Sequence, residues 1–159
     1  MTIREITPTI DTDTLLAGAQ FADAFCVEVA DPGLDARHAA ERMMAHQPQW
    51  AEALVRLRNI LVTPFGLKKS GNGSQAPYGM IGIFPVLSQT PDRLIAGFND
   101  SHLDFRVVVD VASSDTARSV TLTTLVLTHN WFGRTYLAII LPFHRLIAPA
   151  LLRQVAGPA

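Results

Sequence analysis

Charged residues are scarce in this sequence. Only 17% of the 159 residues are Asp, Glu, Lys or Arg, whereas about a quarter is usual in soluble domains. The formal net charge is −1, so there is no basic excess to neutralise phosphates and we expect no nucleic-acid partner. A hydrophobic share of 48% indicates that much of the chain is buried, or that an apolar surface meets a ligand or partner.

Cysteine and several catalytic motifs are also lacking. The single Cys26 cannot form an internal disulfide, and its apolar, strand-like surroundings favour a buried core thiol. There is no Gly-x-Gly-x-x-Gly after a strand, no Gly-Lys-Ser/Thr phosphate loop and no Gly-x-Ser-x-Gly nucleophile elbow. His38 and Glu41 share a predicted helix, but further ligands on that face are not evident. We therefore expect neither a cofactor nor a metal ion.

Segments typical of membrane or secretory proteins are not evident either. Residues 1–14 are polar with isolated isoleucines, unlike a signal peptide. The longest apolar stretch lies within residues 136–152 but contains His144, Arg145 and two prolines. An arginine near a bilayer centre costs about 2.5–3.5 kcal/mol even on the milder insertion scale. We expect a cytoplasmic protein with no transmembrane segment, although an interfacial helix stays open.

The patterns that are present predict one α+β domain. Strands are predicted over residues 21–29, 79–87, 93–99, 102–112 and 118–127. Two helices are predicted between the first two strands, the first over 36–45 capped by Asp35 and the second beginning at Pro48. Short turns make the later strands antiparallel neighbours. The long apolar terminal helix can cover the sheet only if the sheet curves around it.

Several segments resemble a known family. The run Gly-Phe-Asn-Asp-Ser-His-Leu-Asp-Phe-Arg-Val at 97–107, together with 123–130 and 133–145, resembles the bacterial domain-of-unknown-function family 2867. The similarity runs from about residue 21 to residue 153. It implies the START-like, or SRPBCC, helix-grip superfamily, in which a curved antiparallel sheet wraps around a long C-terminal helix. We therefore predict a helix-grip domain over residues 15–156, preceded by an extended segment over 1–14.

The resemblance also carries an expectation about ligands. Many helix-grip domains bind lipids, polyketides or other apolar molecules in the cavity between sheet and helix. The family itself has no assigned activity, so the resemblance supplies no reaction.

His102, Asp104 and Arg106 form a polar triplet on one face of a predicted strand, with apolar residues alternating on the other. In a pocket, Arg106 would bind a carboxylate or phosphate and Asp104 would orient His102 as a base. The apolar face is instead expected to meet the core, which places the triplet on the outer side. The sequence leaves open whether the triplet faces the cavity or solvent.

Four further candidates lie at or in the terminal helix. Asn130 is suited to cap the helix, and His129 beside it either packs at the junction or lines a cavity. Tyr136 either packs in the core or places its hydroxyl in a pocket. His144 interrupts the apolar helix next to Arg145, where we expect a solvent-facing stripe, and Pro142 predicts a kink that could gate a cavity.

Three functions remain open. The leading hypothesis is a domain that binds a small apolar or amphipathic molecule, which requires a cavity of about 300 Å³ or more. The second is an enzyme of the same fold, cyclase-like or hydrolase-like, that uses His102 or His129 with Asp104. The third is a non-catalytic dimerisation or interaction protein, a homo-oligomer or hetero-complex, using the outer face of the sheet near Thr121 and Thr123.

Overall fold

The computed structural model describes residues 2–45, 78–81, 84–99, 102–113 and 117–156. Within them, seven antiparallel strands form one sheet in the order β1-β2-β7-β6-β5-β4-β3. The strands are β1 Arg4–Ile6, β2 Phe21–Val29, β3 Met80–Ile81, β4 Phe84–Gln89, β5 Arg93–Asn99, β6 Leu103–Ser113 and β7 Arg118–Thr128. The helices are α1 Thr12–Leu15, α2 Ala36–Ala45 and α4 Trp131–Val155.

The later strands follow the predicted pattern closely. β5 has the predicted bounds, and β6 and β7 end one residue later than predicted. The strand predicted over 79–87 is divided into β3 and β4. The second predicted helix, beginning at Pro48, lies outside the described residues. The segment 1–14 contains β1 and the start of the single turn α1, which Asp11 caps by accepting from the amides of Asp13 and Thr14.

Asp35 caps α2 as expected. Its Oδ1 accepts from the backbone N of His38 at 2.8 Å, and its carbonyl accepts from the backbone N of Ala39 at 3.0 Å. These two bonds are those of an N-cap residue, and they fix where α2 begins. The helix then buries Ala36, Ala39, Ala40 and Met43 in the core.

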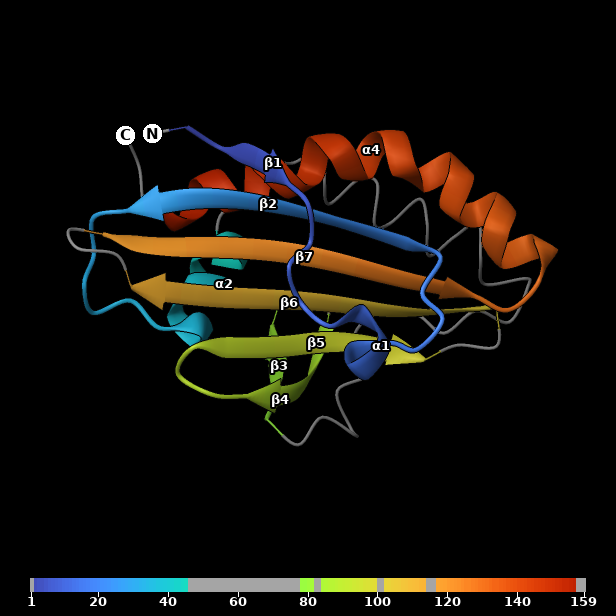
Figure 1. The fold of residues 1–159 in the computed structure, drawn as a ribbon, viewed down its shortest axis with the longest axis horizontal. Coiled ribbons are helices and arrows are strands. Elements are labelled where there is room, and N and C mark those ends of the chain that lie inside the picture. The colour runs from blue at the N-terminus through green and yellow to red at the C-terminus, as the bar shows by residue number, and fades with distance from the viewer. Residues whose placement is uncertain (1, 46–77, 82–83, 100–101, 114–116, 157–159) are drawn as a thin grey trace.

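Both longer helices cover the same face of the sheet. Figure 1 shows α2 behind the sheet and α4 running along the side of β2. The core contains inward-facing residues of β2, β5, β6 and β7 with buried residues of both helices, including Val27, Leu94, Val109, Val120 and Leu152. The molecule is therefore an α+β domain in which an antiparallel sheet holds a long C-terminal helix, the helix-grip arrangement.

The opposite face of the sheet is partly covered by the N-terminal segment. Figure 1 shows α1 and the chain around it crossing in front of the sheet. Val108, Thr123 and Leu125 lie on this face and are almost completely buried. Thr123, which the sequence suggested for an outer interface, is therefore not exposed, whereas Thr121 is half-buried.

The start of α4 is fixed to the start of β6. Asn130 caps the helix, its side-chain oxygen accepting from the backbone N of Gly133 at 2.9 Å. The side-chain nitrogen of Asn130 lies 2.8 Å from Nδ1 of His102. The backbone N of His129 donates to the carbonyl of His102 at 2.9 Å. These contacts set the position from which α4 runs back across the sheet.

Candidate functional site: an apolar cavity beneath the terminal helix

An apolar cavity of about 240 Å³ lies between the sheet and the two longer helices. Phe21, Leu94, Phe105, Leu122 and Val126 are among the sheet residues that line it. Met43 and Met44 line it from α2, and Leu137, Ile140, Leu141, Ile147 and Leu151 line it from α4. The polar lining residues among those described are Thr124, Tyr136 and His144.

Two sequence periods produce this lining. On β6, every second residue from Leu103 to Val109 faces the cavity, because successive side chains of a strand point to opposite faces. On α4, the lining residues from Leu137 to Leu151 recur every three or four positions, which is the spacing of one helix face. The cavity therefore lies where the apolar side of the sheet meets the inner side of α4.

The volume of the cavity is smaller than the value that the ligand-binding hypothesis was expected to require. Its volume of about 240 Å³ is below the 300 Å³ or so at which pockets for drug-sized ligands begin. It is larger than an engineered apolar cavity of about 150 Å³ that binds benzene. The described residues therefore leave space for a compact molecule of about one or two rings.

The cavity wall contains one buried acid–imidazole pair. Nε2 of His144 on α4 lies 2.9 Å and 3.1 Å from the two carboxylate oxygens of Asp23 on β2. The side chains are only 17% and 9% exposed. Phe21 presents its ring to the imidazole at right angles, with the ring centres 6.0 Å apart. His144 therefore faces the sheet, whereas the neighbouring Arg145 is exposed as expected.

Asp23 is the residue that sequence reasoning missed as a site candidate. It lies on the inward-facing side of β2, between the lining residue Phe21 and the core residue Phe25. A lone carboxylate at an inward position of an apolar strand was the available signal, since buried carboxylates are usually paired. Its partner, 121 residues away, could not be identified from sequence.

The polar triplet of β6 lies on the opposite face from the cavity. The Arg106 guanidinium donates to Oδ1 of Asn99 at 2.6 Å and to the carbonyls of Phe98 and Phe105 at 3.1 and 2.8 Å. Partial burial lowers the pKa of Arg106 from its usual value, and the carboxylate of Asp104 opposes that shift. Arg106 thus holds β5 and β6 together from the outer side of the sheet, and it is not one of the residues that line the cavity.

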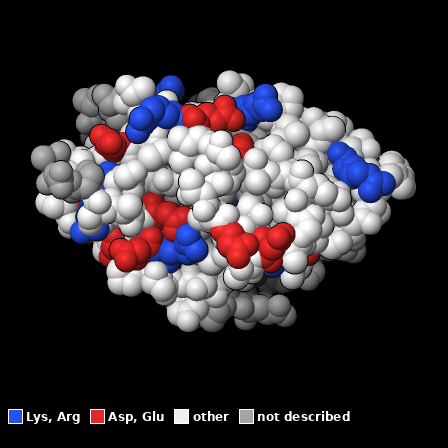
Figure 2. Space-filling model, in the orientation of Figure 1, with Lys and Arg blue, Asp and Glu red and all other residues white. Residues whose placement is uncertain are grey.

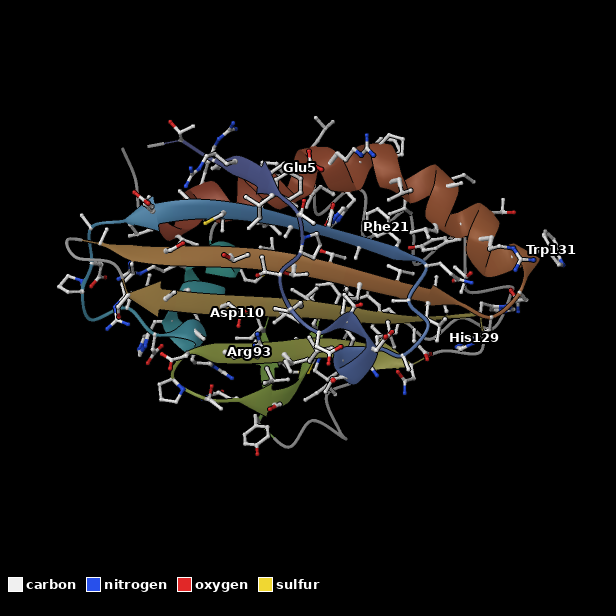
Figure 3. All side chains as sticks on the ribbon, viewed as in Figure 1. Glu5, Phe21, Arg93, Asp110, His129 and Trp131 are labelled. Atoms are coloured by element: carbon white, nitrogen blue, oxygen red, sulfur yellow. The ribbon has the colours of Figure 1, made fainter. Side chains whose placement is uncertain are left out.

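Asp104 and the junction residues form a separate polar group. Nε2 of His129 lies 3.0 Å from Asp104, and the His129 side chain is 39% exposed. The His102 ring packs against Phe132 with the ring centres 4.8 Å apart. Figure 3 shows His129 at the end of the sheet, near the start of α4. Neither His102 nor His129 lines the cavity, so the structure does not bring these histidines to the site that the enzyme hypothesis needs.

The other candidates have mixed positions. Tyr136 lines the cavity from the second turn of α4, and Asn130 is the N-cap described above. Within the described residues, no group of three or more His, Cys, Asp or Glu is arranged to hold a metal ion. Cys26 is buried on β2, with Sγ 3.0 Å from the hydroxyl of Ser119.

The outer face of α4 is apolar and exposed. Trp131, Ile139 and Leu146 are 70%, 61% and 64% exposed, and Phe143, which also lines the cavity, is 40% exposed. Figure 3 shows Trp131 at the far end of the helix, pointing away from the sheet. The helix is long and apolar enough to cross a membrane by length and composition alone, with a mean hydropathy of 1.5, and only 11% of that stretch is buried.

Charge on the outer face of the sheet is concentrated in a few clusters. Figure 2 shows acidic and basic side chains beside one another, separated by wide uncharged areas. One such pair joins Arg93 and Asp110 across β5 and β6, with Nε 2.6 Å from the carboxylate. On the face that Figure 2 shows, the charged side chains do not form one continuous basic patch.

Among solved structures, several resemble this chain at low sequence identity. A protein from Rhodobacter sphaeroides has a TM-score of 0.46 and 10% identity, covering 98% of this chain and 95% of its own. A conserved protein from Geobacillus kaustophilus has a TM-score of 0.43 and 13% identity, covering 86% and 93%. Protein Ms6760 from Mycobacterium smegmatis has a TM-score of 0.43 and 13% identity, covering 97% and 96%. Likeness at this level supports no statement about function.

The sequence profile of a protein family gives the clearest relationship. No curated protein matches the chain significantly. The family described as "Protein of unknown function (DUF2867)" matches residues 15–151. That range includes the lining residues of the cavity and the segments whose resemblance was noted in the sequence. The chain therefore belongs to the DUF2867 family.

Proposed function

We propose that this domain binds a small apolar or amphipathic molecule in the cavity beneath α4. The observation that carries the proposal is an apolar space of about 240 Å³ that is lined by two helices and the sheet and is partly open to solvent. An apolar occupant would remove this lining from water, which is favourable by roughly 25 cal/mol per Å² of apolar surface.

The helix-grip arrangement supports the same proposal. The resemblance to the START-like superfamily implies domains that use this space for lipids, polyketides and related molecules. The low charge of the chain and the lining by Leu, Ile, Met and Phe side chains agree with an apolar occupant. We propose a ligand of one or two rings, or an aliphatic molecule of similar volume.

Native mass spectrometry with denaturing extraction tests for a ligand bound in the host, and naphthalene serves as a defined probe for calorimetric titration. We expect saturable one-to-one binding of naphthalene to the ligand-free protein. Ala148→Leu, at a buried lining position of α4, should weaken this binding at least tenfold. Ala138→Leu, the same change at an exposed position of the same helix, should leave it unchanged.

A second substitution that fills the cavity is available if the first variant does not fold. If Ala148→Leu does not fold, Val107→Phe fills the cavity from β6 instead. Absence of both a copurified molecule and saturable binding of benzene or naphthalene would refute the proposal. Equal binding by the Ala148 and Ala138 variants would place the probe outside the cavity and refute it as well.

The exposed face of α4 favours a second function, binding to an anionic membrane surface. The helix contains Arg134, Arg145 and Arg153 but no acidic residue, so its charge is complementary to anionic lipids. We expect flotation with vesicles of phosphatidylglycerol and phosphatidylcholine, reduced by Ile139→Glu with Leu146→Glu but not by Ser113→Glu on β6. Equal flotation of all variants would show that the exposed face of α4 does not bind the membrane. If sedimentation shows a dimer that the Ile139 and Leu146 variant does not form, this face is instead a contact between two copies of the chain.

A further inference from the structure

Three polar side chains gather at one place in the wall, which apart from Tyr136 is otherwise apolar. Asp23 on β2 is paired across the strands with Thr124 on β7, and His144 on α4 contacts Asp23 from above. Thr124 and His144 both line the cavity, and Asp23 and Thr124 are 8% and 2% exposed. A ligand in the cavity therefore meets hydrogen-bonding groups at this position.

The proton positions follow from the chemistry of the pair. The two Asp23 oxygens lie 2.9 and 3.1 Å from Nε2 of His144, and a carboxylate can only accept, so Nε2 carries the hydrogen that it donates. In the neutral ring, Nδ1 then holds a lone pair and acts as an acceptor. The carboxylate fixes the tautomer and the orientation of the ring.

The second ring nitrogen is available to a ligand. In the described part of the chain, the His144 side chain has no hydrogen-bond partner besides Asp23. No fully buried side-chain nitrogen or oxygen there lacks a partner. Nδ1 therefore retains some solvent-accessible surface, on a side chain that lines the cavity.

A purely structural role explains this pair poorly. Removing a carboxylate and an imidazole from water is costly, and well-packed apolar residues in their place are often equally stabilising or better. Apart from Tyr136, the rest of the wall is apolar, so the packing of α4 against β2 does not depend on a polar contact. Specificity for a polar group on the occupant would explain the arrangement.

We propose that His144, oriented by Asp23, accepts a hydrogen bond from a hydroxyl group of the bound molecule. The ligand class is then an apolar alcohol or phenol that places one hydroxyl at this end of the cavity. A carboxylate head group is disfavoured because the Asp23 carboxylate lies beside the ring. This inference rests on the proposed binding function and narrows its ligand.

A matched series of probes tests the proposed binding function and the proposed role of His144 separately. Naphthalene, 2-naphthol and 2-naphthoate have the same ring system and differ in one group, so their dissociation constants isolate the effect of that group. In the native protein 2-naphthol should bind, and 2-naphthoate should bind at least tenfold more weakly than 2-naphthol. His144→Phe keeps a ring against Phe21 but removes the acceptor. It should weaken 2-naphthol about tenfold, the effect of one lost hydrogen bond, and naphthalene less than threefold.

Further experiments test the role of Asp23 and provide a measurement that does not depend on the folding of a variant. Asp23→Asn should weaken 2-naphthol by a smaller factor, because an amide oxygen can still accept from Nε2, while Asp104→Asn on the outer face should have no effect. If His144→Phe does not fold, the ¹⁵N resonance of Nδ1 in the native protein provides the test. It should shift on adding 2-naphthol and stay unchanged on adding naphthalene.

The outcomes distinguish a failure of the proposed binding function from a failure of the proposed role of His144. If naphthalene and 2-naphthol both fail to bind, the binding function and this inference fail together. If naphthalene binds but His144→Phe weakens both probes equally, or if the Nδ1 resonance does not respond to 2-naphthol, the cavity binds ligands and the hydroxyl-accepting role of His144 is wrong.

Discussion

Gly133 on α4 lies directly against the carbonyl of His102. A β-carbon on Gly133 would be only 2.1 Å from that oxygen, well inside van der Waals contact. The first turn of α4 therefore lies so close to the backbone before β6 that only glycine, which has no side chain, fits at position 133. This contact, with the Asn130 cap, sets the end of α4 that anchors the roof of the cavity.

Gly133→Ala should destabilise the fold. The added methyl group meets backbone atoms, which cannot move aside as a flexible side chain can, so we expect a loss of about 1–3 kcal/mol. Urea denaturation measures it. Gly33→Ala is the control, because a β-carbon there would lie 3.7 Å from the nearest atom. Equal stabilities of the two variants would show that the start of α4 can shift freely.

The polar residues of the outer face should be dispensable for ligand binding. Asp104→Asn and His129→Gln alter a partly exposed pair on the opposite side of the sheet from the cavity. We expect naphthalene affinity within twofold of the native value and a stability loss of at most about 1 kcal/mol. Titration and thermal unfolding provide the measurements. If either variant folds but binds naphthalene much more weakly, the prediction is wrong and the substituted residue takes part in ligand binding.

Pro142 lies inside α4 and leaves the carbonyl of Ala138 without its helical donor. Figure 1 shows α4 as one continuous, curved helix. If this point allows the helix to move away from the sheet, Pro142→Ala should raise the melting temperature and slow naphthalene uptake in stopped-flow mixing. Pro149→Ala, nearer the C-terminal end, should change the uptake rate less. An unchanged rate in Pro142→Ala would rule out a gate here.

The Asp35 cap should make stability depend on acidity. Hydrogen bonds from the His38 backbone lower the pKa of Asp35 below its usual 3.8. The stability it contributes is therefore present above the unfolded pKa and is lost as pH falls through the lower folded value. Asp35→Ala should cost about 0.5–2 kcal/mol at pH 7, with a smaller difference from the native protein below pH 3. Asp92→Ala, an exposed change in a turn, should show neither effect in urea denaturation at both pH values.

The strands could be predicted because their signals are local. Alternation placed Phe105 on the inner face and Arg106 on the outer face. A short turn was predicted between the later strands, and one is present between β4 and β5, where the backbone N of Thr90 donates to the carbonyl of Arg93. The rotation of α4 about its axis could not be predicted in the same way. Adjacent helical residues differ by about 100°, so only packing against β2 decides that His144 faces Asp23 while Arg145 faces solvent.

The sheet ends in two very short strands. β1 and β3 have three and two residues, and β1 carries the charged Arg4 and Glu5. Short, charged edges discourage pairing with strands of other molecules, which matters in a chain of 48% hydrophobic residues. β1 in particular covers one side of the nine-residue strand β2. Losing these few N-terminal residues would uncover the backbone edge of β2 over residues 24–26, next to Asp23, and would leave the domain more prone to aggregate.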